Sequence, residues 1–421
     1  MNYWNAGDLG ITISMVRRIK EEIPHSQVSI VSIFSNMLPK PRKIDDRECG
    51  AKEVEYILSY PFNNYYEAFE APLIAIGSIV FAMLYGKFQR KFYFLIPSSK
   101  KNVIDHFINA DVIISKGGGF LWDKGKGIPS FILSLHQIFI STLLRKPTIL
   151  YAQSIGPFKR SWTGKIVKYV LKKTNLILLR EPVSLGLLGK IKRPKVKVTA
   201  DEAFLLPSAK KERVMEIFVN EGINVSDYPL IGITVRHWSY PFSEDPKGKR
   251  RQYIDAIAKT VDHVIRHYNA TVFFIPHLVG FWGHNDPDMI NEIYKKIQAK
   301  HKTKILGIYS AEEIRGLIGE SKIFIGTRMH SNIYALGECV PCITISYLPK
   351  CEGIMKMLNL EKWVIPIEKV SVKRLISMVE ELWNEKEQIR KKLCLEIPKI
   401  QEKAKQNAMA IKSFIDEKKL K

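Results

Sequence analysis

Short apolar runs alternate with longer amphipathic stretches from about residue 229 to residue 370. The apolar runs have the length and composition of buried strands, and the stretches between them have the spacing of helices with one buried face. The strands are expected at Leu230–Val235, Thr271–Ile275, Lys304–Leu306, Ile323–Ile325 and Cys342–Ser346, and the helices at about 249–267, 285–300, 310–320 and 329–338. This alternation predicts a parallel sheet covered by helices.

The same alternation, less regular, fills the first half of the chain. Strands are expected at Val28–Phe34, Val54–Ser59, 92–96, Val112–Ser115, Thr148–Gln153, Leu176–Leu179 and Val196–Thr199, and helices at Gly10–Glu22, 68–90, Pro129–Arg145 and 161–173. The pattern predicts an α/β protein with two Rossmann-like lobes, at residues 1–208 and 229–370, joined by a polar linker. Residues 371–421 are predicted to form helices that cross back to the first lobe.

The charge balance is strongly basic, with 65 Lys and Arg against 42 Asp and Glu and a formal net charge of +23. So large an excess indicates a polyanionic partner: nucleic acid, an anionic membrane surface, or phosphorylated small molecules. The basic residues are spread over the predicted helices without an interleaved aromatic patch, so no nucleic-acid partner is expected. A steep salt dependence of binding to random DNA would favour that alternative instead.

The cysteines show no paired metal-ligand spacing, although two of them form a CxxC across a predicted helix end and strand start. They are at positions 49, 339, 342, 351 and 394. We expect buried thiols in a reducing compartment, and hence a cytoplasmic protein. The polar, turn-like start, residues 1–8, does not resemble a signal peptide.

One segment, residues 71–86, carries no charge over its whole length. It is short for a membrane span, and Pro72, Gly77 and Ser78 weaken that interpretation, so a buried core helix is expected. Peripheral docking of this helix, or of the lysine-rich surface, on an anionic membrane stays open as an alternative.

The candidate functional residues lie between the strand Ile323–Ile325 and the next helix. There Arg328 and His330 stand at the helix N-terminus, at the carboxyl edge of the sheet where open α/β folds bind ligands. Arg236 follows the first strand of the same lobe and faces the same edge. Arginine side chains and a helix N-terminus both favour anions, and two arginines can hold a carboxylate and a phosphate together. The pattern predicts an anionic substrate beside a titratable histidine.

Other turn residues after strands are candidates for the same cleft, each with a structural alternative. Asp8 can cap the first helix, and Asp286 or Asp288 can cap the helix that begins near residue 286. A salt bridge within the lobe would explain Arg180-Glu181. Gly117, Gly118 and Gly119 are expected to form a turn with bare amides for a phosphate or sugar. The candidates for the acceptor or the cleft are Asn5, Asp8, Gly117, Gly118, Gly119, Gln153, His277 and His284.

Several of these motifs occur in one order: Asn5-x-Gly-Asp8, GGG at 117–119, QSIGPF at 153–158, RE at 180–181, DEAFLL at 201–206, ITVR at 233–236, HND at 284–286 and GTRMHS at 326–331. With this ordered set the chain resembles the polysaccharide pyruvyl transferase family over about residues 2–350. The resemblance implies a glycosyltransferase-B-like fold. It also implies transfer of a pyruvyl group from phosphoenolpyruvate to two hydroxyls of a sugar residue, forming a cyclic ketal.

By the same resemblance, Arg236, Arg328, His330 and Ser331 would bind the donor. Arg328 and His330 would be catalytic, with His330 as the candidate general acid. The partners would be phosphoenolpyruvate, as donor substrate, and a glycan or lipid-linked saccharide. No cofactor or metal is expected, because the chemistry demands none. The chain departs from the family pattern at its start, where almost no strand precedes Asn5.

The alternative enzyme is a nucleotide-sugar glycosyltransferase on the same two-lobed fold, which would also use a cationic cleft. No clear acidic residue is placed to pair with a ribose, although Glu352 could serve. For the pyruvyl transferase, Arg328→Ala or His330→Ala is expected to abolish activity and leave the melting temperature nearly unchanged.

Overall fold

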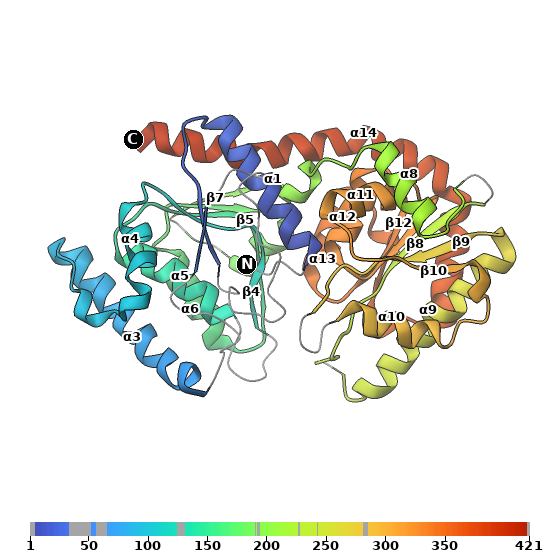
Figure 1. Ribbon diagram of the computed structural model, residues 1–421, viewed down its shortest axis with the longest axis horizontal. Coiled ribbons are helices and arrows are strands. Elements are labelled where there is room, and N and C mark those ends of the chain that lie inside the picture. Colours follow the sequence, from blue (N-terminus) through green and yellow to red (C-terminus); the bar gives the residue numbers. More distant parts are fainter. Residues whose placement is uncertain are drawn as a thin grey trace. The chain divides into compact units, whose positions relative to one another are not determined.

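The computed structural model describes residues 5–32, 52–55, 65–123, 131–189, 191, 194–225, 228–241, 243–280 and 285–418 (Figure 1). The described chain divides into two compact units. Unit 1 comprises the described residues of Ile11–Glu202 and Lys403–Lys421, and unit 2 those of Trp4–Gly10 and Ala203–Glu402. The first helix therefore begins in unit 2, and the last helix ends in unit 1.

Unit 2 is built on a six-stranded sheet in which every neighbouring pair is parallel. In spatial order the strands are β10 (Thr303–Ile305), β9 (Thr271–Phe274), β8 (Leu230–Thr234), β11 (Ile323–Gly326), β12 (Cys342–Ser346) and β13 (Val364–Pro366). The order of connection reverses between β8 and β11, which is the arrangement of a Rossmann fold. The predicted α/β architecture is confirmed, and the reversal marks where a ligand is expected.

Most helices of unit 2 lie where the sequence predicts helices. The helices are α8 (Lys211–Asn220), α9 (Pro246–Tyr268), α10 (Asp286–Tyr294), α11 (Ala311–Gly319), α12 (Met329–Gly337), α13 (Pro349–Lys356) and most of α14 (Val372–Lys418). Local signals set several of their ends: Ser310 and Glu313 form a capping box at α11, and Asn269 ends α9 in the left-handed conformation. The sequence pattern missed β13 and α13 because each is short and contains a proline.

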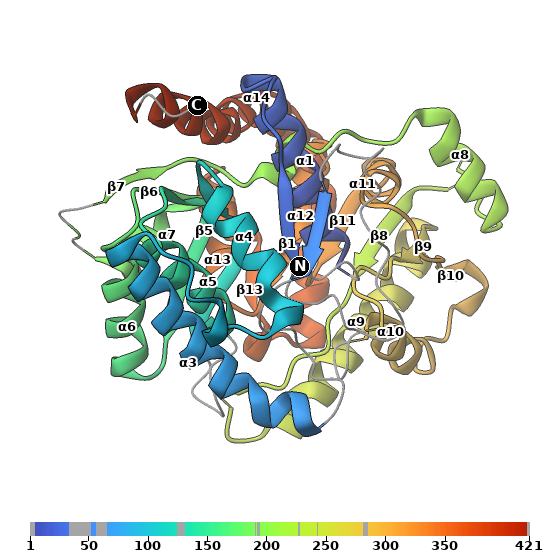
Figure 2. The ribbon, with the colours of Figure 1, turned by 60° about the vertical axis from the view of Figure 1, so that its left-hand side comes forward.

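Unit 1 has its own parallel sheet, in the order β3 (Ile113–Ser115), β5 (Thr148–Phe158), β6 (Leu176–Leu179) and β7 (Lys195–Val198), with β4 (Gly118–Asp123) also paired to β5. A separate parallel pair is formed by β1 (Ser29–Ser32) and β2 (Lys52–Glu55). The helices are α1 (Ala6–Glu22), α3 (Tyr65–Phe88), α4 (Lys101–Asn109), α5 (Phe131–Leu143), α6 (Ser161–Leu171), α7 (Pro182–Leu188) and the end of α14. Figure 2 shows α3, α4 and α5 beside one another, where they share one hydrophobic core.

The expected glycine turn at residues 117–119 is wrong. Gly118 and Gly119 begin β4, which continues along β5 beyond the point where β3 ends, because β5 is eleven residues long. Gly118 has φ +148°, and a Cβ on it would lie 2.4 Å from the Phe120 ring. The glycine is thus explained by strand geometry.

One further expectation is wrong, and the structural alternative given for Arg180 is confirmed. The apolar segment 92–96 forms a single 3₁₀ turn, Tyr93–Leu95, in place of a strand. Arg180 and Glu181 have structural roles: Arg180 Nη1 lies 2.6 Å from Asp201 Oδ2 in a fully buried ion pair, and Glu181 caps α7 by accepting from the Ser184 amide at 3.0 Å.

The thiols are less uniformly buried than expected. Cys342 and Cys351 are buried and Cys339 is half-buried, but Cys394 is exposed on α14. All four are free, and Cys49 lies outside the described residues. The expectation of buried thiols is therefore wrong for Cys394.

Glu202 gives unit 1 a testable pH dependence. It is fully buried, and burial raises its pKa from 4.5 to about 8 despite the hydrogen bond it accepts from Asn407 at 2.9 Å. The folded state therefore holds this proton more tightly than the unfolded chain does. The resulting stabilisation is complete below about pH 4.5 and is lost as the pH rises through about 8.

In Glu202→Gln, the free energy of unfolding should no longer decrease with pH between these two values as it does in wild type. Chemical denaturation across that range would detect it, with the exposed Glu212→Gln as matched control. An unchanged slope in Glu202→Gln would contradict the assignment.

Candidate active site

Two loops of unit 2 meet where the strand order reverses. Thr234 and Gly326 are paired in the register of β8 and β11, and the Thr327 amide donates to the Thr234 carbonyl at 3.0 Å. Arg236 and Arg328 each follow this pair by two residues, so the register alone sets them side by side. The Tyr253 hydroxyl accepts from the Arg236 amide at 3.4 Å and bonds the Thr327 hydroxyl at 2.8 Å, which ties the two loops together.

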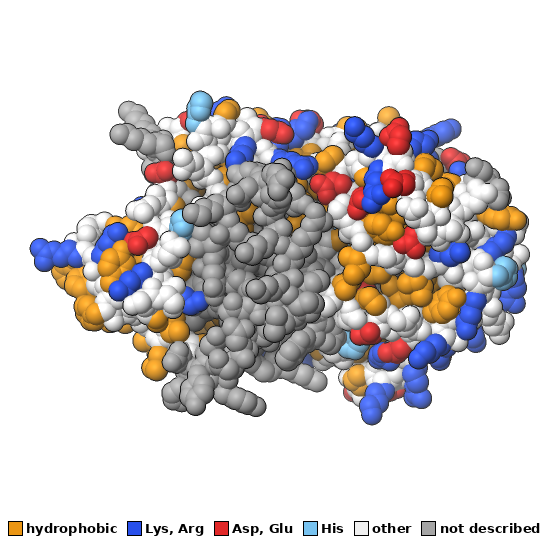
Figure 3. Space-filling model, in the orientation of Figure 1, with side chains coloured by type: hydrophobic (Ala, Val, Ile, Leu, Met, Phe, Trp, Pro, Cys, Tyr) orange, Lys and Arg blue, Asp and Glu red, His pale blue; other side chains and the backbone are white. Residues whose placement is uncertain are grey.

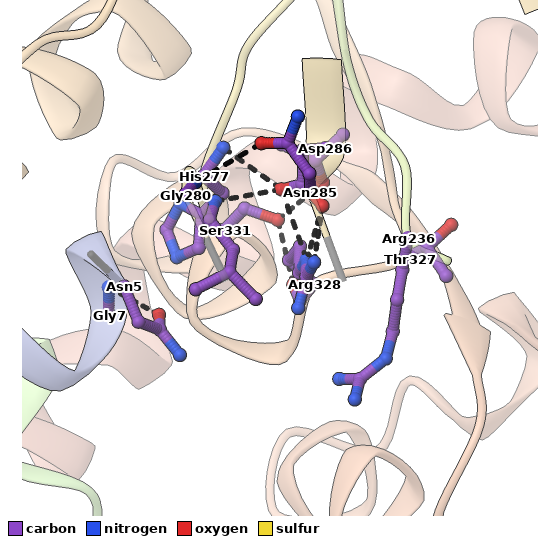
Figure 4. Close-up of polar contacts among 12 residues, drawn as sticks. Asn5, Gly7, Arg236, His277, Gly280, Asn285, Asp286, Thr327, Arg328 and Ser331 are labelled. Atoms are coloured by element: carbon purple, nitrogen blue, oxygen red, sulfur yellow. Dashed lines mark hydrogen bonds and ion pairs between the residues drawn. The ribbon is translucent and has the colours of Figure 1, made fainter. Parts of the chain in front are cut away.

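Arg328 is held by a buried carboxylate. Its Nε lies 3.1 and 3.2 Å from the two oxygens of Asp286, and its Nη2 also contacts Asp286 Oδ1 (Figure 4). Both side chains are buried. Asp286 Oδ2 in turn accepts the amides of His277 and Leu278 at 3.0 and 2.8 Å. The carboxylate therefore fixes the arginine and the loop after β9. Capping, one of the two alternatives open for Asp286, is not its role, because Asn285 occupies the N-cap position of α10.

Arg236 is held by aromatic rings. Its Cζ lies 3.9 Å from the centre of the Tyr347 ring and 5.2 Å from that of Trp238. Its Nε is buried and has no hydrogen-bond partner among the described residues. Burial lowers its pKa, and the positive charge of Arg328 lowers it further. A guanidinium in these surroundings would gain from an anion beside it.

His330 lies in the first turn of α12, directly after Arg328 and Met329. It is largely buried, with 9% of its surface exposed, and its imidazole packs against the backbone of Gly7. The first turn of a helix presents amides without partners inside the helix, so this position favours an anion next to the imidazole.

The start of α1 forms one wall of this site. Asn5 precedes the helix and caps it by accepting from the Gly7 amide at 3.1 Å, and its side-chain amide donates to Asp8 at 3.1 Å. Asn5 also forms an antiparallel bridge with Leu278. The Ala6 amide donates to the His277 carbonyl at 3.0 Å, and the Tyr334 hydroxyl donates to the Ala6 carbonyl at 3.1 Å. The expected capping by Asp8 is thus performed by Asn5.

Gly7→Ala should disrupt the site through a single methyl group. A Cβ at this position would lie 2.1 Å from His330 Nδ1, so the imidazole must move. We expect loss of about 100-fold or more in catalysis, since a misplacement of about 1 Å can cost that much. Steady-state kinetics would measure it. Gly186→Ala is the matched control, because a Cβ there meets nothing within 4 Å. Equal activities of the two variants would contradict this packing.

His277 is also part of this wall, but its environment keeps it neutral. It is 2% exposed, and burial lowers its pKa well below the ordinary value, with the neighbouring charges of His330 and Arg328 adding to the effect. Neither ring nitrogen has a hydrogen-bond partner among the described residues. His277 is therefore suited to a hydrogen bond with a ligand and unsuited to donating a proton at neutral pH.

Ser331 lies beneath the site. Its hydroxyl is fully buried, donates to the Arg328 carbonyl at 2.7 Å and bonds the Thr234 hydroxyl at 2.6 Å. These contacts fix the turn that carries Arg328, and the expected donor contact of Ser331 stays a prediction.

The remaining candidates are not part of this group. Residues 117–119 and Gln153 belong to unit 1, and His284 lies outside the described residues. Gln153 is 1% exposed, and neither polar atom of its side chain has a hydrogen-bond partner in the described structure. A buried amide of this kind is a candidate ligand contact, so its predicted acceptor role stays a prediction. No group of three or more His, Cys, Asp or Glu side chains within the described ranges is arranged to hold a metal ion.

Tyr253 and Tyr347 were not singled out in the sequence, and Asp286 was named there without its pairing to Arg328. Asp286 stands 42 residues from Arg328, and Tyr253 lies in the middle of α9, so neither contact leaves a local pattern. Tyr347 directly follows β12, the strand next to β11, and that position at the carboxyl edge was a usable signal.

Comparisons with known proteins give the family and the fold. A family model described as polysaccharide pyruvyl transferase matches residues 5–349. The amylovoran biosynthesis protein AmsJ of Erwinia amylovora is 25% identical over 298 residues, which cover 70% of each chain. Among solved structures, the UDP-GlcNAc 2-epimerase of Neisseria meningitidis has a TM-score of 0.55 at 13% identity and covers 96% of both chains. The sucrose-phosphate synthase of Thermosynechococcus elongatus has a TM-score of 0.56 at 8% identity and covers 96% of this chain and 92% of its own. These two likenesses show the glycosyltransferase-B-like fold and nothing more.

Proposed function

The chain belongs to the polysaccharide pyruvyl transferase family and is a transferase, and from this premise we propose that it moves a pyruvyl group from phosphoenolpyruvate to a sugar residue as a cyclic ketal. The observation that carries the proposal is the placement of Arg236, Arg328 and His330 around the strand-order reversal of unit 2. The similarity to a protein of amylovoran biosynthesis supports a polysaccharide as the modified molecule.

The donor's two anionic groups match the cations of the site. Phosphoenolpyruvate carries a carboxylate and a phosphate ester on the same enol carbon. Arg236 has an Nε without a described partner, and Arg328 is held in a fixed orientation by Asp286. The start of α12 adds amides that favour a phosphate. We assign one anionic group of the donor to each arginine, with the imidazole of His330 next to them.

The reaction needs one proton on carbon and two new carbon–oxygen bonds. The His330 imidazolium gives a proton to the donor's methylene, which becomes a methyl group and leaves the enol carbon electrophilic. A sugar hydroxyl forms the first bond to that carbon and gives up its proton, which restores the imidazolium. A second hydroxyl of the same sugar forms the second bond as the carbon–oxygen bond to phosphate breaks. Phosphate leaves with the electron pair and accepts the second hydroxyl's proton. General acid help of this kind is worth about 10²–10⁴-fold, and the arginines stabilise the charge that develops.

The direct test is transfer itself. Purified full-length chain is incubated with phosphoenolpyruvate labelled with ¹³C in the pyruvyl carbons and with candidate acceptor glycans, free or lipid-linked. The expected product is a glycan that gains one labelled ketal group by mass spectrometry, with one phosphate released per group gained. Phosphate release without label on any glycan would contradict the proposal.

Arg236 offers a test of the donor site. Arg236→Met keeps an apolar contact with Tyr347 and removes the charge, so it should weaken phosphoenolpyruvate binding by about 10-fold or more and leave acceptor binding little changed. Separate Michaelis constants for donor and acceptor would show the split. The exposed Arg213→Met on α8 is the matched control. A variant that loses acceptor binding instead would contradict the assigned role.

A nucleotide-sugar glycosyltransferase is the alternative outcome of these measurements. The epimerase from Neisseria meningitidis carries UDP-GlcNAc on a similar fold, and here Glu352 stands in the first turn of α13, 3.2 Å from the Ser346 hydroxyl. Tight binding of a UDP- or GDP-sugar, with none of phosphoenolpyruvate, would favour that function.

A further inference from the structure

Helix α3 of unit 1 exposes an apolar ridge. Leu73, Ile76, Val80 and Met83 are 64%, 60%, 38% and 56% exposed, and their spacing sets them on one face of the helix. An 18-residue window, Ala71–Phe88, is apolar and long enough to cross a membrane by length and composition, and only 22% of it is buried. The expectation of a buried core helix is therefore wrong for this face. An apolar face of this size needs a partner.

The opposite face of α3 is fixed to the unit. Phe81 and Ala82 are fully buried in a core shared with α4 and α5. The Ser78 hydroxyl lies 3.1 Å from His136 Nε2 in α5, and a Cβ on Gly86 would lie 2.2 Å from the Leu143 carbonyl oxygen. A helix packed this closely along one side cannot cross a bilayer without unfolding that core. The free ridge is available only for a surface laid along it.

Aromatic and basic residues surround the C-terminal end of the ridge. Phe88 and Phe94 are 51% and 82% exposed and meet through edge-to-face contacts with Phe92. Lys87 and Arg90 are exposed cations at this end, and the exposed Lys91 is paired with Asp105 at 2.9 Å. Figure 3 shows hydrophobic side chains along α3 with Lys or Arg side chains at its tip.

We propose that this ridge is a membrane-docking surface, on which α3 lies in the plane of an anionic bilayer. Leu73, Ile76 and Met83 enter the acyl boundary, the exposed phenylalanines sit at headgroup level, and the neighbouring cations contact anionic headgroups. The net charge of +23 acts in the same direction. The basic residues at the end of the ridge complement anionic headgroups, which favours a bilayer as the occupant, and a second copy of the chain is an outcome of the test.

The test is flotation of the full-length chain with vesicles of phosphatidylcholine, with and without phosphatidylglycerol. Wild type should float with the anionic vesicles, only weakly with the neutral ones, and less at high salt. Ile76→Glu and Met83→Glu should each lower the partition coefficient by about tenfold, and Arg90→Glu should lower only the anionic component. Leu395→Glu and Val219→Glu are matched controls, because these apolar side chains are 71% and 72% exposed in unit 2.

Three results would overturn the proposal. The first is equal binding to neutral and anionic vesicles. The second is a dimer in sedimentation velocity that Ile76→Glu dissociates, with no vesicle binding. The third is α3 variants that float like wild type. Vesicle binding does not depend on the donor or acceptor, so these outcomes are separate from the test of pyruvyl transfer.

Discussion

Arg328→Ala is expected to abolish pyruvyl transfer and also to lower the free energy of unfolding by about 3–5 kcal/mol. The second effect departs from the sequence-based expectation of a nearly unchanged melting temperature. Asp286 is 0% exposed and pairs with Arg328 through more than one contact. Removing the guanidinium leaves a carboxylate buried without its counter-charge. Denaturant titration and the labelled transfer assay measure the two effects on the same protein.

Two companion variants separate charge from geometry at this pair. Arg328→Lys keeps the positive charge and loses the forked contact, so it should retain more stability than alanine while transfer stays low. Arg328→Ala combined with Asp286→Asn removes both charges and should recover part of the lost stability without recovering transfer. An Arg328→Ala protein as stable as wild type would show that the buried pair does not have the assigned role.

His330→Gln is expected to reduce transfer by about 10²–10⁴-fold while the melting temperature falls less than for Arg328→Ala. Glutamine fills a similar volume beside Gly7 but supplies no proton to the donor's methylene. The pH–rate profile should lose the limb that reports the general acid. Donor binding should weaken much less than turnover.

His277→Gln is the matched control for this prediction. His277 is adjacent to His330, but its lowered pKa keeps it neutral, so its replacement should leave the shape of the pH–rate profile unchanged. If His277→Gln removes the limb and His330→Gln does not, the general acid has been assigned to the wrong histidine.

Four strands of unit 2 (β8, β9, β11 and β12) were predictable because each is a buried apolar run, and the two arginines were predictable because each lies two residues after one of these strands. The register of β8 and β11 then places Arg236 next to Arg328, because each lies two residues after the pair Thr234 and Gly326. Such positions can be predicted in a parallel sheet, because the carboxyl ends of its strands lie at one edge.

What the sequence did not show depends on contacts distant along the chain. The pairing of Asp286 with Arg328, and the packing of Gly7 against His330 from the start of α1, are set by tertiary structure and have no periodic pattern. The turn predicted at residues 117–119 was wrong for a different reason. Three glycines indicate a turn by composition, whereas here the chain continues as β4 along a long neighbouring strand.

Titration calorimetry with phosphoenolpyruvate tests the donor site most directly. Wild type should bind phosphoenolpyruvate, bind UDP-GlcNAc far more weakly, and lose most of its donor affinity in Arg236→Met while Arg213→Met binds like wild type. Tight binding of UDP-GlcNAc, together with no heat from phosphoenolpyruvate, would contradict the account.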